Sequence, residues 1–87
     1  MTITQRVKQF ILDNFFVGDT GGVEEDTSLI AEGIVDSTGM LEIIGFLEAE
    51  FGIEVADAET TPDNLETLGR IVAFVERKRA ALPGDAR

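Results

Sequence analysis

The sequence contains neither cysteine nor histidine. Without cysteine the chain can form no disulfide bond and no thiolate metal site, which is consistent with a reducing compartment. Without histidine it lacks the commonest general base and the commonest metal ligand. A Ser/His/Asp or Cys/His catalytic set cannot be assembled from this chain, so we expect neither enzyme activity nor a metal site of its own.

Basic residues are also few, since 7 lysines and arginines stand against 17 aspartates and glutamates, a net charge of −10. Such a charge repels phosphate backbones and anionic membrane surfaces, and we expect no nucleic acid as partner. It favours encounters with proteins that present basic patches.

Long apolar runs are missing too. Arg6, Lys8, Gln9 and Asp13 interrupt the N-terminal segment, so it does not have the apolar region of a signal peptide. No stretch approaches the ~20 apolar residues of a membrane span. We therefore predict a cytoplasmic location without membrane insertion.

The hydrophobic residues make up 44% of the chain and recur at helical spacing. One amphipathic helix is predicted from Ile3 to Phe16, with Thr2 or Thr4 as its cap. A second follows Asp36, a good N-cap, as far as Phe51, where Gly52 ends it. Its core stripe is predicted from the spacing of five residues: Met40, Ile43, Ile44, Leu47 and Phe51.

Two more helices are predicted in the C-terminal part of the chain. Thr61 and Pro62 favour the start of a helix of one or two turns. Thr67 caps the last helix, which Pro83-Gly84 closes. The stripe predicted to be buried in that helix consists of Leu68, Ile71, Val72 and Val75.

Residues 17–35 show no sustained period and are predicted to form a long loop, a feature that is often functional or held against the core. The residues expected to hold it there are Val23, Leu29, Ile30, Ile34 and Val35. The fold class is thus all-α: a small four-helix bundle with three longer helices and one short helix. We expect residues 1–82 to form a single domain and 83–87 a short polar tail.

Ser37 directly follows the cap of the second helix. The simplest interpretation is that Asp36 caps and Ser37 fills the first turn. A serine with no histidine or lysine beside it is a poor nucleophile but a good attachment point, because another enzyme can supply the base and the metal. A phosphodiester there would lie against the positive end of the helix, which stabilises anions.

The chain resembles the acyl carrier protein family, in which a serine in an Asp-Ser-Leu motif opens the second of four helices and carries 4′-phosphopantetheine. The resemblance rests on Gly33, Asp36-Ser37, "MLEIIGFLEAEFGIEV" from 40 to 55 and "TPDNLETLGRIVAFVERK" from 61 to 78. It covers nearly the whole chain and implies that residues 1–82 are a carrier domain.

By this resemblance Ser37 would hold the phosphopantetheine, and Asp36 would support its attachment. Partner enzymes would bind to one side of the second helix, which we call the docking face. The docking face comprises Thr38, Leu41, Glu42, Gly45 and Glu48. The helical spacing independently places Leu41 and Glu48 beside Ser37, whereas Glu42 lies farther round.

Two departures from the family pattern favour a specialised, free-standing carrier over the general fatty-acid carrier. Thr38 stands where the family usually has leucine, and Gly39 where fatty-acid carriers often have an acid. The expected partners of this monomer are a phosphopantetheinyl transferase, an acyl-loading or adenylating ligase, and acyl-processing or acyltransferase enzymes with basic docking patches. Fatty acyl, polyketide, aminoacyl and hydroxyacyl cargo all stay open. The alternative is a non-catalytic interaction module of the same fold without a cargo-carrying arm.

Overall fold

The computed structural model describes residues 2–15 and 24–81. The secondary structure of these residues consists of helices, without an extended strand. An isolated antiparallel bridge joins Ser28 to Thr67. The helices in chain order are α1 (Ile3–Asn14), α2 (Ser37–Phe51), the 3₁₀ helix η2 (Asp57–Glu59), α3 (Pro62–Leu65) and α4 (Leu68–Ala81). The predicted all-α bundle with three longer helices and one short helix is confirmed; the polar tail 83–87 lies outside the described residues.

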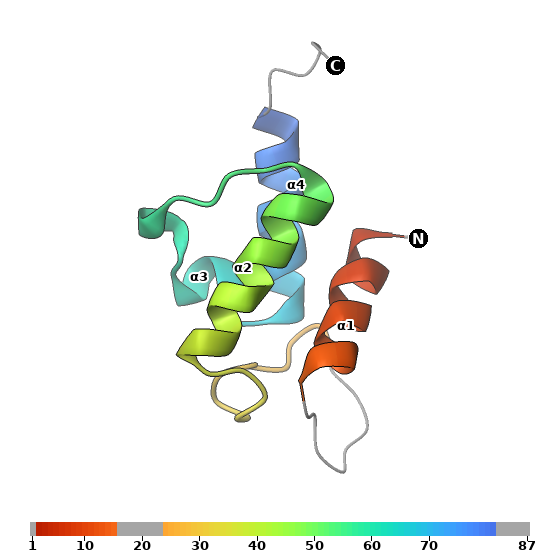
Figure 1. Cartoon of the computed structure of the whole chain (residues 1–87), viewed down its shortest axis with the longest axis vertical. Helices are drawn as coiled ribbons and strands as arrows, with labels where there is room; N and C mark the ends of the chain where they lie inside the picture. The colour runs from red at the N-terminus through yellow and green to blue at the C-terminus, as the bar shows by residue number, and fades with distance from the viewer. Residues whose placement is uncertain (1, 16–23, 82–87) are drawn as a thin grey trace.

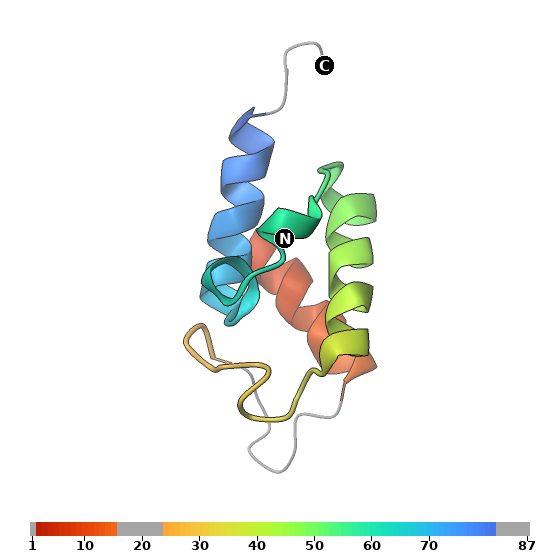
Figure 2. The same ribbon diagram turned by 90° about the vertical axis from the view of Figure 1, so that its left-hand side faces the viewer.

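The three long helices enclose the core (Figure 1). Turned by 90°, α2 and α4 stand on either side of the molecule and α1 passes between them (Figure 2). None of the described helices is both long and apolar enough to cross a bilayer. The buried hydrophobic residues come from every one of these elements except η2 and also from the loops: Val7, Ile11, Leu29, Val35, Ile43, Leu47, Ile53, Leu65, Leu68, Ile71, Phe74 and Val75.

Helix α1 begins with a capping box. The Thr2 hydroxyl accepts a hydrogen bond from the Gln5 backbone N–H at 3.1 Å, and the Gln5 side chain accepts one from the Thr2 N–H at 2.9 Å. The helix ends at Asn14, two residues before the predicted end, because Phe15 adopts an extended conformation. Phe10 stacks on Phe46 of α2 with ring centroids 4.2 Å apart, which joins the two helices.

The buried stripe of α4 is rotated relative to the prediction. Phe74 is 2% exposed and belongs to the core, whereas Val72 lies at the core's edge. Thr67 caps this helix as predicted, since its hydroxyl accepts from the Arg70 N–H at 3.1 Å.

Polar side chains join both η2 and the short helix α3 to α4. Lys78 Nζ lies 2.9 and 3.0 Å from the two carboxylate oxygens of Glu59, and Arg77 donates to the Asn64 side chain at 2.7 Å. Thr61 occupies the N-cap position of α3, but its side chain makes no capping hydrogen bond. These pairs and the buried Leu65 hold the segment from η2 through α3 against α4.

Candidate functional site at the start of α2

Asp36 sets where α2 begins. Its backbone is extended, and its Oδ1 accepts a hydrogen bond from the Gly39 N–H at 2.7 Å. This satisfies one of the N–H groups that a helix leaves unpaired at its start. The predicted N-cap is confirmed, and Ser37 becomes the first residue of the helix.

Ser37 is exposed to solvent, as are Asp36 and Thr38. The Ser37 hydroxyl therefore stands at the surface, at the helix end where backbone N–H groups and the macrodipole favour a negatively charged group. An enzyme can reach this oxygen without unfolding any part of the bundle.

Gly39 lies beneath the exposed turn and is buried. A Cβ atom placed there would come within 2.7 Å of Cε1 of Phe15 and 3.3 Å of Cγ1 of Val35. The glycine thus lets α2 approach the end of α1 closely. Its sequence neighbourhood gave no signal of this contact, because Phe15 is 24 positions away.

The docking face predicted from the sequence follows α2 upward from Ser37. Leu41, one turn after Ser37, is 68% exposed. Glu42, Gly45 and Glu48 are also exposed, and a Cβ at Gly45 would meet no atom within 4 Å. The Glu48 carboxylate accepts a hydrogen bond from the Val55 N–H at 2.9 Å, so it also secures the segment that follows α2.

This side of the molecule keeps its negative charge. Helix α2 carries Glu42, Glu48 and Glu50 and no lysine or arginine. Within the described residues Arg6 pairs with Glu50 of α2, whereas Lys78 pairs with Glu59, Arg70 with Asp63 and Glu66, and Arg77 donates to Asn64. None of these ion pairs involves Glu42 or Glu48. An acidic surface is therefore available to a basic partner.

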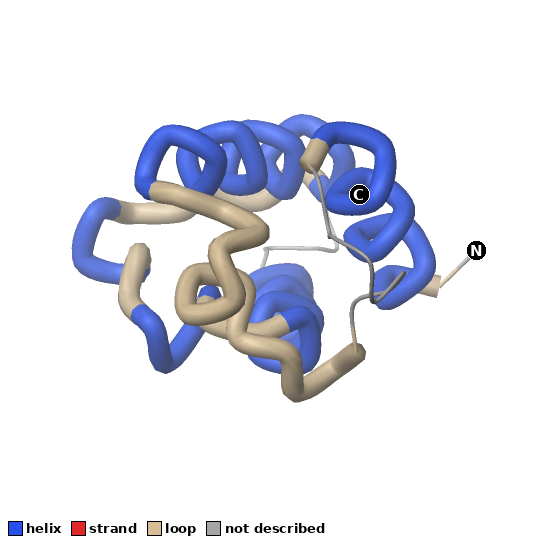
Figure 3. Tube along the Cα trace, turned by 90° about the horizontal axis from the view of Figure 1, so that it is seen from below, coloured by secondary structure: helices blue, strands red, loops and turns tan. Residues whose placement is uncertain are grey.

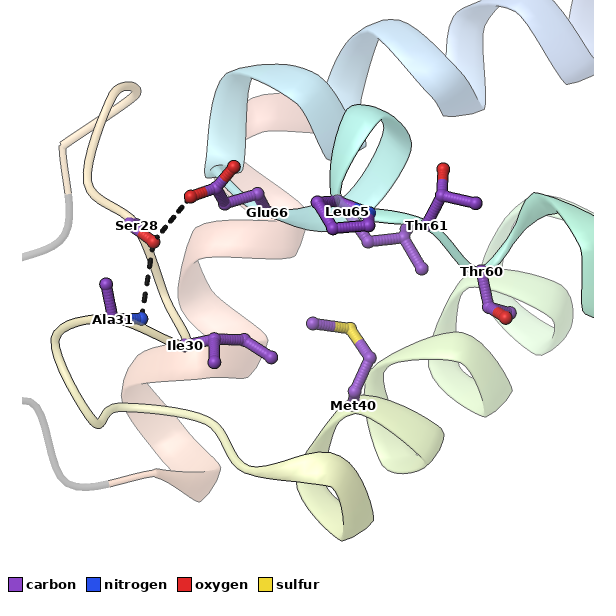
Figure 4. A pocket seen from close by; sticks show the side chains of 9 residues that line it. Ser28, Ile30, Ala31, Met40, Thr60, Thr61, Leu65 and Glu66 are labelled. Carbon is purple, nitrogen blue, oxygen red and sulfur yellow. Dashed lines mark hydrogen bonds between the residues drawn. The ribbon is translucent and has the colours of Figure 1, made fainter.

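A pocket of about 450 Å³ opens beside the first turn of α2. Figure 4 shows the side chains of Ile30 and Met40 pointing toward one another, with Leu65 reaching toward them from α3. Met40 follows Ser37 by three positions, so the two side chains lie on neighbouring turns of one helix face. The residues that line the pocket are Ser28, Ile30, Ala31, Met40, Thr60, Thr61, Pro62, Leu65 and Glu66.

One end of the pocket is polar. Ser28 donates a hydrogen bond from its Oγ to Glu66 Oε2 at 3.0 Å, and the Leu29 N–H donates to the Glu66 carbonyl at 2.9 Å. The Gly69 N–H donates to the Glu25 carbonyl at 2.8 Å. These bonds hold the described part of the long loop, drawn in tan in Figure 3, across one end of the bundle.

The sequence prediction for this loop was right in part. Leu29 and Val35 are buried and Ile34 is partly buried. Ile30 was expected to help hold the loop against the core, but it is 52% exposed and lines the pocket instead. It lies in a turn in which its carbonyl accepts a hydrogen bond from the Gly33 N–H at 3.0 Å. Val23 lies outside the described residues.

Comparison with known proteins gives the family. No protein-family model matches the chain. An acyl carrier protein of Sinorhizobium fredii is 35% identical over 78 residues, which cover 90% of this chain and 96% of the relative. The chain belongs to the acyl carrier protein family.

Two further relatives are also named as carriers. The D-alanyl carrier protein of Abiotrophia defectiva is 37% identical over 57 residues, 66% of this chain and 72% of that protein. The probable acyl carrier protein PigG of a Serratia species is 31% identical over 70 residues, 80% of each. These similarities support a carrier protein and partner enzymes in general.

Members of this family generally bear phosphopantetheine. The residues at the start of α2 fit such a group: an exposed hydroxyl on Ser37, a helix N-terminus that favours its phosphate, and a pocket one turn away.

Proposed function

We propose that this protein is a free-standing acyl carrier whose Ser37 holds 4′-phosphopantetheine. The observation that supports the proposal best is the exposure of Ser37 as the first residue of α2, in a chain whose family generally carries this group. When bound, the group supplies a terminal thiol that holds an acyl chain as a thioester.

In the attachment step, Ser37 Oγ forms a bond to the phosphorus of coenzyme A that bears the pantetheine. The phosphoanhydride bond breaks, 3′,5′-ADP leaves, and the serine proton passes to a base of the phosphopantetheinyl transferase. The chain has no histidine to act as that base. Asp36 has one carboxylate oxygen committed to the Gly39 N–H, which leaves its other oxygen for the transferase's metal ion.

The docking face would bring partner enzymes to Ser37. The exposed Leu41 supplies an apolar contact, and Glu42 and Glu48 supply charge that speeds association with basic patches. A tethered substrate has an effective concentration of about millimolar for a short flexible link, so weak docking is sufficient. Catalysis would reside in the partners, which include an acyl-loading or adenylating ligase and acyl-processing enzymes.

We further propose that residues 1–82 act as one carrier domain in a specialised lipid or secondary-metabolite pathway. The relative named as a D-alanyl carrier protein favours a role outside general fatty-acid synthesis. The pocket beside Met40 would shelter the tethered group between partners.

The test is the intact mass of the protein after incubation with coenzyme A and a phosphopantetheinyl transferase of broad specificity. We expect a gain of one phosphopantetheine in the natural chain and in Ser28→Ala, and none in Ser37→Ala. Ser28 is the matched control, because it and Ser37 are the only serines in the sequence. An unchanged mass of the natural chain would support the interaction module instead.

A further inference from the structure

We infer that the acyl group carried by this protein bears an amine, which Glu66 recognises at the polar end of the pocket. This inference rests on the proposed function, because the cargo is the group that Ser37 is proposed to tether. It concerns the chemistry of the cargo, which neither the family nor the exposure of Ser37 determines.

The first observation is the charge of the pocket. Of the nine residues that line it, Glu66 alone carries an ionisable side chain, and that side chain is anionic. The middle of the pocket, between Ile30, Met40 and Leu65, is apolar. Thr60 and Thr61 also line the pocket, and their hydroxyls carry no charge. A ligand that matches the apolar middle and Glu66 has a short hydrocarbon body and a hydrogen-bond donor at its end.

The second observation is the incomplete pairing of the Glu66 carboxylate. Its Oε2 accepts one hydrogen bond from Ser28, and its Oε1 lies 3.7 Å from Arg70 Nη1. Two carboxylate oxygens offer about four acceptor sites, so capacity remains. Arg70 also lies 3.7 Å from Asp63 and donates to the Pro62 carbonyl at 3.4 Å, so its charge is divided among several acceptors.

The possible acyl groups differ in how their ends would interact with Glu66. A plain alkyl chain that reached Glu66 would remove water from a carboxylate whose side chain is 39% exposed, without replacing the lost hydrogen bonds. A carboxylated acyl group would add repulsion between like charges. A protonated amine restores a hydrogen bond to the carboxylate and adds charge attraction, which makes it the favoured end group.

Three acyl groups of similar size test this inference: β-alanyl, butyryl and malonyl, each loaded onto Ser37 from its coenzyme A thioester by the transferase. We expect β-alanyl to shift the backbone amide NMR signals of Leu29 and Glu66 most, and malonyl least. We also expect Glu66→Gln to speed hydrolysis of the β-alanyl thioester about threefold to tenfold, as expected for loss of a partly exposed charge-assisted hydrogen bond, and to leave the butyryl thioester unchanged.

The matched control is Glu76→Gln, which removes one exposed carboxylate from α4 away from the pocket lining. It should leave all three hydrolysis rates unchanged. The NMR comparison uses the natural chain alone and stays decisive if Glu66→Gln fails to fold.

Equal amide shifts for the three acyl groups, or the largest shifts with butyryl or malonyl, would overturn the inference. A natural chain that gains no mass with coenzyme A would instead overturn the proposed function. The two failures are therefore distinguishable.

Discussion

Gly39 and Phe15 touch so closely that a side chain at position 39 would force the ring to shift, because a Cβ there would lie 2.7 Å from Cε1 of the ring. This contact joins the end of α1 to the first turn of α2, directly beneath Ser37. Gly45, two turns after Ser37 in the same helix, has no atom within 4 Å of the corresponding position.

The two glycines predict stability changes of opposite sign. Gly45→Ala should raise the free energy of unfolding by up to about 1 kcal/mol, because alanine favours a helix interior over glycine. Gly39→Ala should lower it by about 1–2 kcal/mol, because the gain in helix propensity is smaller than the cost of overpacking against Phe15 and Val35. Urea unfolding of the two variants measures both, and a stabilised Gly39→Ala would contradict the packing described here.

We expect the Glu59 carboxylate to make the free energy of unfolding depend on pH in the acid range. The hydrogen bond from the Ala56 N–H and then the Lys78 ammonium hold the pKa of Glu59 below its ordinary value of 4.5. Because the folded state favours the charged form, this stabilisation is complete above pH 4.5 and is lost as the pH falls through the lowered pKa.

Glu59→Gln should therefore lower stability at pH 6 and reduce its decline between pH 4.5 and lower pH. Urea midpoints over this range measure the effect. Glu76→Gln, which removes an exposed carboxylate from α4, controls for the change in net charge. Parallel pH profiles for Glu59→Gln and the natural chain would refute the assignment.

We expect the negative charge on the docking face to speed association with the phosphopantetheinyl transferase. Glu42→Lys should lower kcat/KM for the phosphopantetheinyl transferase about threefold to tenfold at low salt, because it replaces attraction to a basic patch by repulsion. The difference should shrink as salt is added. Glu76→Lys makes the same charge change on α4 and should have a smaller effect; equal effects would mean that net charge, not the docking face, controls association.

Local sequence signals predicted the helices and the start of α2 well. Asp36, Gly52 and Thr67 act as caps or stops through contacts within four residues, which can be inferred from the sequence alone. The 3.6-residue period also identified Ile43 and Leu47 as core. It located the buried stripe of α4 less well, because it included the partly buried Val72 and missed the buried Phe74.

The pocket could not be predicted from the sequence. Its polar end depends on Ser28 and Glu66, which are 38 positions apart, and its apolar middle depends on the outward turn of Ile30. Likewise, the sequence placed Glu48 on the docking face but did not indicate that its carboxylate accepts a hydrogen bond from the Val55 backbone. Hydrogen bonds such as these form where a loop packs against a helix that is distant in the sequence. Hydrophobic periodicity does not indicate which residues meet there.

The chain has two neighbouring exposed residues with hydroxyl groups at the start of α2, Ser37 and Thr38, and we propose that only Ser37 carries the phosphopantetheine. Cleavage after glutamate releases a peptide of residues 33–42 that contains both. Fragmentation of this peptide after treatment with coenzyme A and the transferase should place the phosphopantetheine on Ser37. A group found on Thr38, or a peptide that stays unmodified, would contradict the account.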